Sequence, residues 1–320
     1  MLHQHTPSTE NASSAHLDRD GQALTHIDPL ALQGSQLRKI SLYDNRLTIF
    51  PQQIFDHTNL QVLNISCNHT HAVAAADRAI TPSWKCWISA TTRRHRSPMR
   101  SVQLTQLRYL YLSDNHFSDL PHTLGQLGEL RYLNVTDNRL AAVPTAVWQL
   151  GNLQELRLYN NAITSLPAAI GRLTRLRELH LMKNRLSELP ATIAELTALN
   201  VLDVANNAIE RLPDSFGQLS QLRELNLRFN ALTHLPEAFC QLGALQSLDL
   251  RANRLSTLPA GMAEMKNLRR LGFTLERLHT VSRGARQPDC TRLSGTRLKS
   301  PGKKKGATGA LYHASQRSTV

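Results

Sequence analysis

Leucines that recur every 23 residues constrain the fold of this 320-residue chain more than any other feature. A representative repeat, from Leu176 to Ala198, reads LRELHLMKNRLSELPATIAELTA, or L-x-x-L-x-L-x-x-N-x-L-x-x-L-P-x-x-I-x-x-L-x-x. An incomplete and irregular half-repeat around Leu17 precedes the full repeats. Because no repeat can bury its leucines alone, the pattern predicts a solenoid of stacked repeats. The leucines that open a repeat are Leu37, Leu60, Leu107, Leu130, Leu153, Leu176, Leu199, Leu222 and Leu245.

The spacing within a repeat predicts a short strand followed by a turn and a return segment. The x-L-x-L part alternates polar and apolar residues, which is typical of a strand that points its leucines inward. Stacked repeats then form one parallel sheet, and the trailing I-x-x-L closes a wedge-shaped core. A column of prolines, such as Pro121 and Pro144, fits extended backbone on the opposite side, because proline fixes φ and lacks a donor. The fold class is therefore an α/β solenoid.

An asparagine stands where each predicted strand ends and the chain turns. Its side-chain amide offers two donors and an acceptor. Backbone groups left unpaired in a buried turn cost roughly 1–3 kcal/mol each, so we expect these amides to satisfy them. The residues of this predicted structural ladder are Asn45, Asn68, Asn115, Asn138, Asn161, Asn184, Asn207, Asn230 and Asn253.

This motif, matched at nearly every fixed position in seven consecutive repeats, resembles the leucine-rich repeat family. The 23-residue form is similar to that of intracellular Ras-group scaffold proteins and of many bacterial proteins, and the resemblance extends from about Leu17 to Leu271. It implies a horseshoe with a parallel concave β-sheet and a convex side of extended, 3-10 or short helical segments. It also implies a concave sheet that binds other proteins, and no catalytic residue.

Two segments depart from the repeat. The irregular residues 69–103 lie between the repeats that open at Leu60 and Leu107. These two leucines are 47 positions apart, one more than the length of two repeats. In a shifted reading frame the block from Trp84 to Ile88 permits the start of a repeat. We therefore interpret 69–103 as a frame disruption in the gene or its sequencing, with a genuine inserted loop as the alternative. This break predicts that the repeats opening at Leu37 and Leu60 are only weakly coupled to the remaining repeats of the solenoid.

The tail carries the same signs of a shifted frame. We expect three parts: a disordered N-terminus over residues 1–16, the repeat domain over 17–271 with the irregular segment 69–103 inside it, and a basic disordered tail over 272–320.

The irregular segments also account for the basic composition. The formal net charge is +13, of which residues 69–103 supply +5 and residues 272–320 supply +8. The repeats are neutral, so the charge is poor evidence for a nucleic-acid partner. The run SPGKKKGATG, residues 300–309, keeps nucleic-acid binding through the tail as a weak alternative.

Several classes of site lack a sequence signal. The four cysteines, Cys67, Cys86, Cys240 and Cys290, form no C-x-x-C motif and favour a reducing compartment. We see no signal peptide, membrane span, phosphate-binding glycine loop or kinase signature. We expect no enzyme activity, catalytic residue, metal or cofactor. We also expect the protein to be cytoplasmic at synthesis, and secretion as an effector is the alternative.

The candidate binding surface is the predicted concave face, onto which the residues two, four, six and seven positions after each opening leucine project. Five of the six tyrosines fall there, and exposed aromatic side chains are preferred anchors at protein interfaces. The alternative is that tyrosines merely stabilise strands by stacking. His180 and Glu178 resemble an acid–base pair, although a solvated strand pair is the simpler interpretation. The candidate residues are Tyr43, Tyr109, Tyr111, Tyr132, Glu155, Arg157, Tyr159, His180, Arg228, Phe229 and Arg251.

The predicted function is a non-catalytic scaffold or signalling module that presents a tyrosine-rich concave surface to a protein partner. We expect no nucleic-acid, membrane or small-molecule partner. The alternative is the substrate-recognition arm of a bacterial effector or signalling enzyme that lost its catalytic domain by frame disruption.

Overall fold

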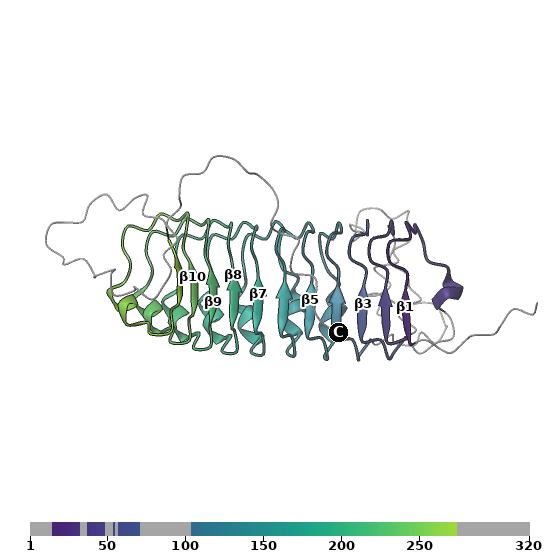
Figure 1. Ribbon diagram of the computed structural model, residues 1–320. Coiled ribbons are helices and arrows are strands. Elements are labelled where there is room, and N and C mark those ends of the chain that lie inside the picture. The colour runs from purple at the N-terminus through teal and green to yellow at the C-terminus, as the bar shows by residue number, and fades with distance from the viewer. Residues whose placement is uncertain (1–14, 33–36, 49–53, 55–56, 71–103, 274–320) are drawn as a thin grey trace, which may run out of the picture.

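Eleven strands form one parallel sheet whose spatial order follows the chain from β1 to β11 (Figure 1). The computed structural model describes residues 15–32, 37–48, 54, 57–70 and 104–273. Consecutive strands pair in register, so Leu133 lies between Leu110 and Leu156. The strands are β1 (His16–Asp18), β2 (Lys39–Ser41), β3 (Val62–Asn64), β4 (Tyr109–Tyr111), β5 (Tyr132–Asn134), β6 (Glu155–Arg157), β7 (Glu178–His180), β8 (Val201–Asp203), β9 (Glu224–Asn226), β10 (Ser247–Asp249) and β11 (Arg270–Gly272).

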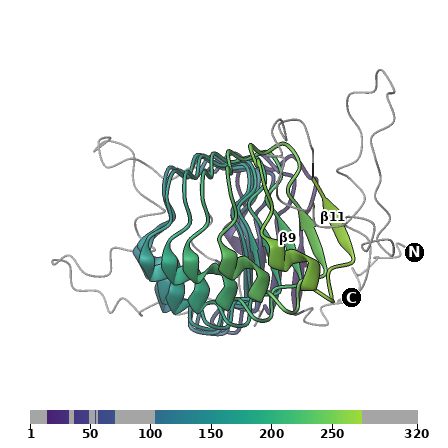
Figure 2. The ribbon, with the colours of Figure 1, turned by 90° about the vertical axis from the view of Figure 1, so that its left-hand side faces the viewer.

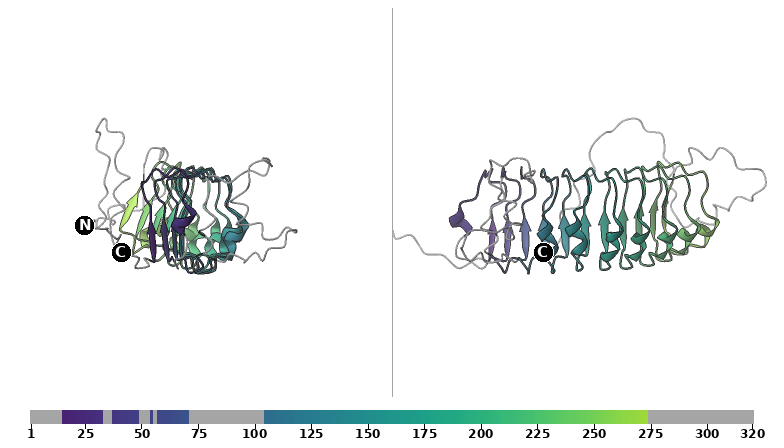
Figure 3. Two further views of the ribbon diagram at one scale, coloured as in Figure 1. Left: turned by 90° about the vertical axis from the view of Figure 1, so that its right-hand side faces the viewer. Right: turned by 180° about the vertical axis from the view of Figure 1, so that it is seen from behind.

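Short 3-10 helices line the side of the solenoid opposite the sheet (Figures 2 and 3). A proline precedes each helix from η3 to η9 and adopts extended backbone, as at Pro121 with φ −64° and ψ 145°. This confirms the predicted convex side. None of the helices in the described residues combines the length and apolar character needed to cross a membrane. The helices are η1 (Pro29–Leu32), η3 (His122–Gln126), η4 (Thr145–Gln149), η5 (Ala168–Arg172), η6 (Ala191–Glu195), η7 (Asp214–Gln218), η8 (Glu237–Gln241) and η9 (Ala260–Glu264).

The core is one continuous column of apolar side chains between the sheet and the helices. Buried residues from Ile27 to Leu268 belong to the same cluster. The central leucine of each strand from β3 to β10 is almost completely covered, as at Leu110 and Leu133. Each repeat therefore buries its leucines against both neighbours, which confirms the predicted α/β solenoid.

The asparagine side chains bind consecutive repeats together through the backbone. Asn138 Nδ2 donates to the carbonyl oxygens of Leu112 at 2.9 Å and Val135 at 3.2 Å, and its Oδ1 accepts from the N–H of Phe117 at 2.9 Å. The other eight ladder asparagines bond equivalent backbone groups of their own and the preceding repeat. These eight are Asn45, Asn68, Asn115, Asn161, Asn184, Asn207, Asn230 and Asn253.

The sheet continues without a break between β3 and β4, although 47 positions separate their paired residues. Val62 pairs with Tyr109 in the same register as every other strand pair. Asn115 spans this junction, since its Nδ2 donates to Ile65 O and its Oδ1 accepts from Thr70 N, both at 3.1 Å.

The prediction that the break uncouples the first repeats is wrong, because the strand pairing and the asparagine bonds carry directly across it. The latent repeat predicted near Trp84 lies outside the described residues. Direct pairing of β3 with β4 leaves no position between them for a further strand.

Candidate functional site

Each strand presents two side chains to the concave face, which is the sheet face directed away from the core. In β4, Leu110 points inward while Tyr109 and Tyr111 flank it and point outward. Side chains at one repeat position stack laterally at the strand spacing of about 4.8 Å, which brings neighbouring rows into contact. The 23-residue period therefore determines which side chains meet on this face.

Two tyrosines of β4, Tyr109 and Tyr111, both pack with tilted rings against Tyr132 of β5. The ring centroids of Tyr111 and Tyr132 lie 4.7 Å apart, and those of Tyr109 and Tyr132 lie 6.4 Å apart. Arg157, on β6, places its guanidinium carbon 5.7 Å from the centre of the Tyr132 ring. We call Tyr109, Tyr111 and Tyr132 the aromatic cluster.

The aromatic cluster has partly buried members and one solvent-exposed member. Tyr111 and Tyr132 are half-buried, whereas Tyr109 is 39% exposed. Burial raises the pKa of both Tyr111 and Tyr132. Their hydroxyl groups therefore stay protonated at neutral pH, where each can donate and accept a hydrogen bond.

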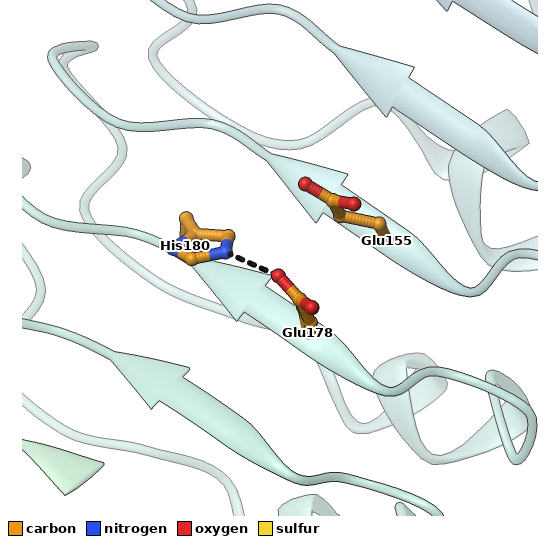
Figure 4. Close-up of side chains that lie close together, drawn as sticks. All are labelled: Glu155, Glu178 and His180. Carbon is orange, nitrogen blue, oxygen red and sulfur yellow. Dashed lines mark hydrogen bonds and ion pairs between the residues drawn. The ribbon is translucent and has the colours of Figure 1, made fainter. Parts of the chain in front are cut away.

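A charged cluster adjoins the aromatic cluster on β6 and β7. Arg157 Nε donates to Glu155 Oε1 at 2.5 Å. His180 Nε2 lies 3.2 Å from Glu178 Oε2, and the three side chains of Glu155, Glu178 and His180 converge on one spot of the sheet (Figure 4). The hydrogen bond from His180 lowers the pKa of Glu178.

The remaining candidate residues lie apart from these two clusters. Tyr43 follows β2 and is 41% exposed, and its hydrogen bond with Cys67 raises its pKa. Arg228 stacks on Phe229 with 4.5 Å between the guanidinium carbon and the ring centre. Arg251 is paired with Asp249 on β10. The candidate residues thus form separate patches along the face.

Tyr159 follows β6, beyond the aromatic cluster. Burial and the nearby Asp137 carboxylate raise its pKa. Glu178 was not in the list of candidate residues, although the sequence had already suggested a pair with His180. Its position two residues before His180 on one strand puts both side chains on the same face.

Residues preceding the ladder asparagines adopt left-handed backbone and turn their side chains to the edge of the concave face. Asp114 has φ 51°, and Asn and Asp tolerate this region well. Phe229 has φ 54° and is 45% exposed, although a bulky residue is disfavoured there. Backbone propensity therefore does not explain why a phenylalanine occupies position 229.

Cys67 occupies the same column, between Asp44 and Asp114. Its Sγ lies 3.6 Å from Asp114 Oδ2. Burial raises the pKa of the Cys67 thiol to about 11, which keeps it protonated and unreactive at neutral pH.

Comparison with known sequences agrees with the repeat architecture. A family model described as a leucine-rich repeat region matches residues 88–185. A second model, described as leucine rich repeat, matches residues 174–232 and 197–255. Together they span more than half of the chain. No curated protein matches the chain in overall sequence.

Solved structures show the same fold. A leucine-rich repeat protein of Leptospira interrogans is 30% identical, with a TM-score of 0.70 over 81% of this chain and 60% of its own. The ectodomain of the Arabidopsis thaliana receptor kinase GASSHO1/SCHENGEN3, in complex with CASPARIAN STRIP INTEGRITY FACTOR 2, is 28% identical, with a TM-score of 0.65 over 81% of this chain and 29% of its own. The plant peptide hormone receptor RGFR1, in complex with RGF2, is 25% identical, with a TM-score of 0.60 over 78% of this chain and 38% of its own.

The chain thus spans between 29% and 60% of the length of these neighbours. The stacked strands, the asparagine ladder and both family models agree with one another. The chain belongs to the leucine-rich repeat family.

Proposed function

We propose that the protein binds another protein or a peptide on its concave sheet, with the aromatic cluster as the main anchor. The observation that carries this proposal is the stack of Tyr109, Tyr111 and Tyr132 on the outward face of the sheet. The core needs none of these rings, because the inward positions of the same strands are filled by leucines.

Rigidity favours tight binding at this surface. The strands that carry the tyrosines are held in register by neighbouring strands and by the asparagine ladder. Stacking on Tyr132 further restricts the Tyr111 ring before any contact with a partner. Less side-chain entropy is then lost on binding, which is the principal cost that preorganisation reduces.

Structural neighbours support the same use of the fold. Two of these neighbours are complexes, one with CASPARIAN STRIP INTEGRITY FACTOR 2 and the other with RGF2. We extend to this chain only the general role of binding a protein or peptide, without catalysis. The tyrosine-rich surface is part of the proposal.

The test compares tyrosine variants with convex-side variants in quantitative affinity capture. Tyr109→Ala and Tyr132→Ala should each weaken binding of the captured partner by roughly 2 kcal/mol, about thirtyfold, as expected for central aromatic anchors. Arg172→Ala and Glu264→Ala, both exposed on convex helices, serve as matched controls and should bind normally. Circular dichroism should show every variant folded. Normal binding by both tyrosine variants contradicts the proposal.

The role as the recognition arm of a larger bacterial enzyme stays a prediction. The nucleotide sequence beyond codon 271 tests it, because a further open frame encoding a catalytic domain supports that role and an immediate stop codon removes it.

A further inference from the structure

Three potential metal ligands meet on two adjacent strands of the concave face. Glu155 on β6 and Glu178 on β7 are direct lateral partners in the sheet, and His180 lies two residues along β7 on the same face. One ligand atom from each side chain lies within 4.8 Å of the others (Figure 4). The parallel register therefore assembles this group from positions 23 residues apart.

The donor set has the chemistry of a zinc site. Imidazole nitrogen and carboxylate oxygen are both zinc ligands, with bonds of about 2.0–2.2 Å. Ligand atoms at neighbouring corners of such a tetrahedron are about 3.3 Å apart. His180 Nε2 and Glu178 Oε2 already lie 3.2 Å apart. Glu155 has to approach by at most about 1.5 Å, which rotation about its side-chain torsions supplies.

The surrounding charge favours a cation. Asp203 on β8 is the lateral partner of His180, so a third acidic residue adjoins the two glutamates in the sheet. Among the described residues, Arg157 is the cation hydrogen-bonded to this group, with 2.5 Å between its Nε and Glu155 Oε1. The side chains of His180 and Glu178 are 16% and 41% exposed, so an ion can reach the spot from solvent.

Arg157 and a metal ion compete for the same carboxylate. In the described structure one oxygen of the Glu155 carboxylate, Oε1, is held by the Arg157 guanidinium. A bound ion would displace this guanidinium from Glu155. Removing Arg157 would therefore leave Glu155 free to bind metal.

We propose that Glu155, Glu178 and His180 form a binding site for a divalent transition-metal ion of the zinc class, and that the ion displaces Arg157 from Glu155. The fourth position of the ion would remain open to water or to a side chain of a partner. This site is independent of the protein-binding proposal, because it requires no partner.

The experiment is calorimetric titration of the full chain with zinc chloride alone. His3→Ala and His5→Ala are introduced in every variant, because this N-terminal pair could bind zinc separately. His180→Ala and Glu178→Gln should each weaken binding at least about tenfold, because loss of even an outer hydrogen-bond partner of a metal ligand typically costs that much. The exposed His234→Ala is the matched control and should bind like the parent.

Arg157→Ala should tighten zinc binding about two- to fivefold, the size expected when one exposed ion pair no longer competes. Circular dichroism melts should agree across the set. If His180→Ala does not fold, Glu178→Gln still tests the site, because glutamine keeps the shape of the glutamate side chain. Equal affinities for the parent, His180→Ala and Glu178→Gln overturn the site. Unchanged or weaker binding by Arg157→Ala overturns the role of Glu155.

Discussion

Replacement of a single ladder asparagine, as in Asn184→Ala, should destabilise the solenoid strongly. Asn184 is 8% exposed. Its Nδ2 donates to the carbonyl oxygens of Leu158 and Leu181, each at 3.0 Å, and its Oδ1 accepts from Ile163 N–H at 3.0 Å. Alanine removes these three bonds and a longer one from Nδ2 to Met182 O at 3.4 Å, and it provides no replacement.

The expected magnitude follows from the backbone groups left behind. Three buried backbone groups lose a partner, at roughly 1–3 kcal/mol each, and some rehydration will offset part of this. We expect a loss of about 3 kcal/mol in the free energy of unfolding. With a typical urea dependence of about 2 kcal/mol per molar, the unfolding midpoint should fall by about 1.5 M.

The assay is urea unfolding followed by circular dichroism, with Asn152→Ala as the matched control. Asn152 Nδ2 donates to Gly128 O at 2.7 Å in a solvent-exposed position, where water can replace the bond, so this variant should lose about 1 kcal/mol or less. Asn184→Asp keeps the acceptor but loses both donors, and it should be at least as destabilised as Asn184→Ala. Equal midpoints for Asn184→Ala and Asn152→Ala would refute the reasoning.

Three further predictions concern other parts of the chain. Because burial raises the pKa of Cys67 to about 11, its alkylation should be slow at pH 8 and should accelerate as pH rises towards 11; peptide mapping that shows a half-maximal rate near pH 8.5 contradicts this. Phe229→Asn should raise the free energy of unfolding by up to about 1 kcal/mol, and with it the urea midpoint, since Asn tolerates φ 54° better than Phe; a lowered midpoint argues against strain at this position. Tryptic cleavage within 71–103 should leave two fragments that co-elute in size-exclusion chromatography, because β3 pairs with β4; separate elution means that this pairing does not hold them together.

The repeat columns of the sequence predicted most of the fold. The register of Leu110, Leu133 and Leu156 follows directly from the 23-residue period, as does the column of asparagines. Continuity across residues 71–103 could not be predicted, because an irregular segment of this length fits both a missing repeat and an excursion from one. The pairing of Val62 with Tyr109 decides between them in the structure.

The candidate site was predictable in its membership but less so in its contacts. Periodicity placed Tyr109, Tyr111 and Tyr132 on one face, and the structure brings them into a stack. Periodicity does not determine side-chain rotamers, so the position of Arg157 between Glu155 and the Tyr132 ring was not foreseeable.

Hydroxyl-radical footprinting of the chain with and without its captured partner tests the concave-face account most directly. It measures the solvent exposure of individual side chains, and Tyr109 is 39% exposed in the free protein while Tyr43 is 41% exposed away from the aromatic cluster. The account predicts that the partner lowers oxidation of Tyr109 and Tyr132 severalfold and changes the exposed convex-side His122 little. Unchanged oxidation of both tyrosines, together with protection of the convex helices, would contradict it.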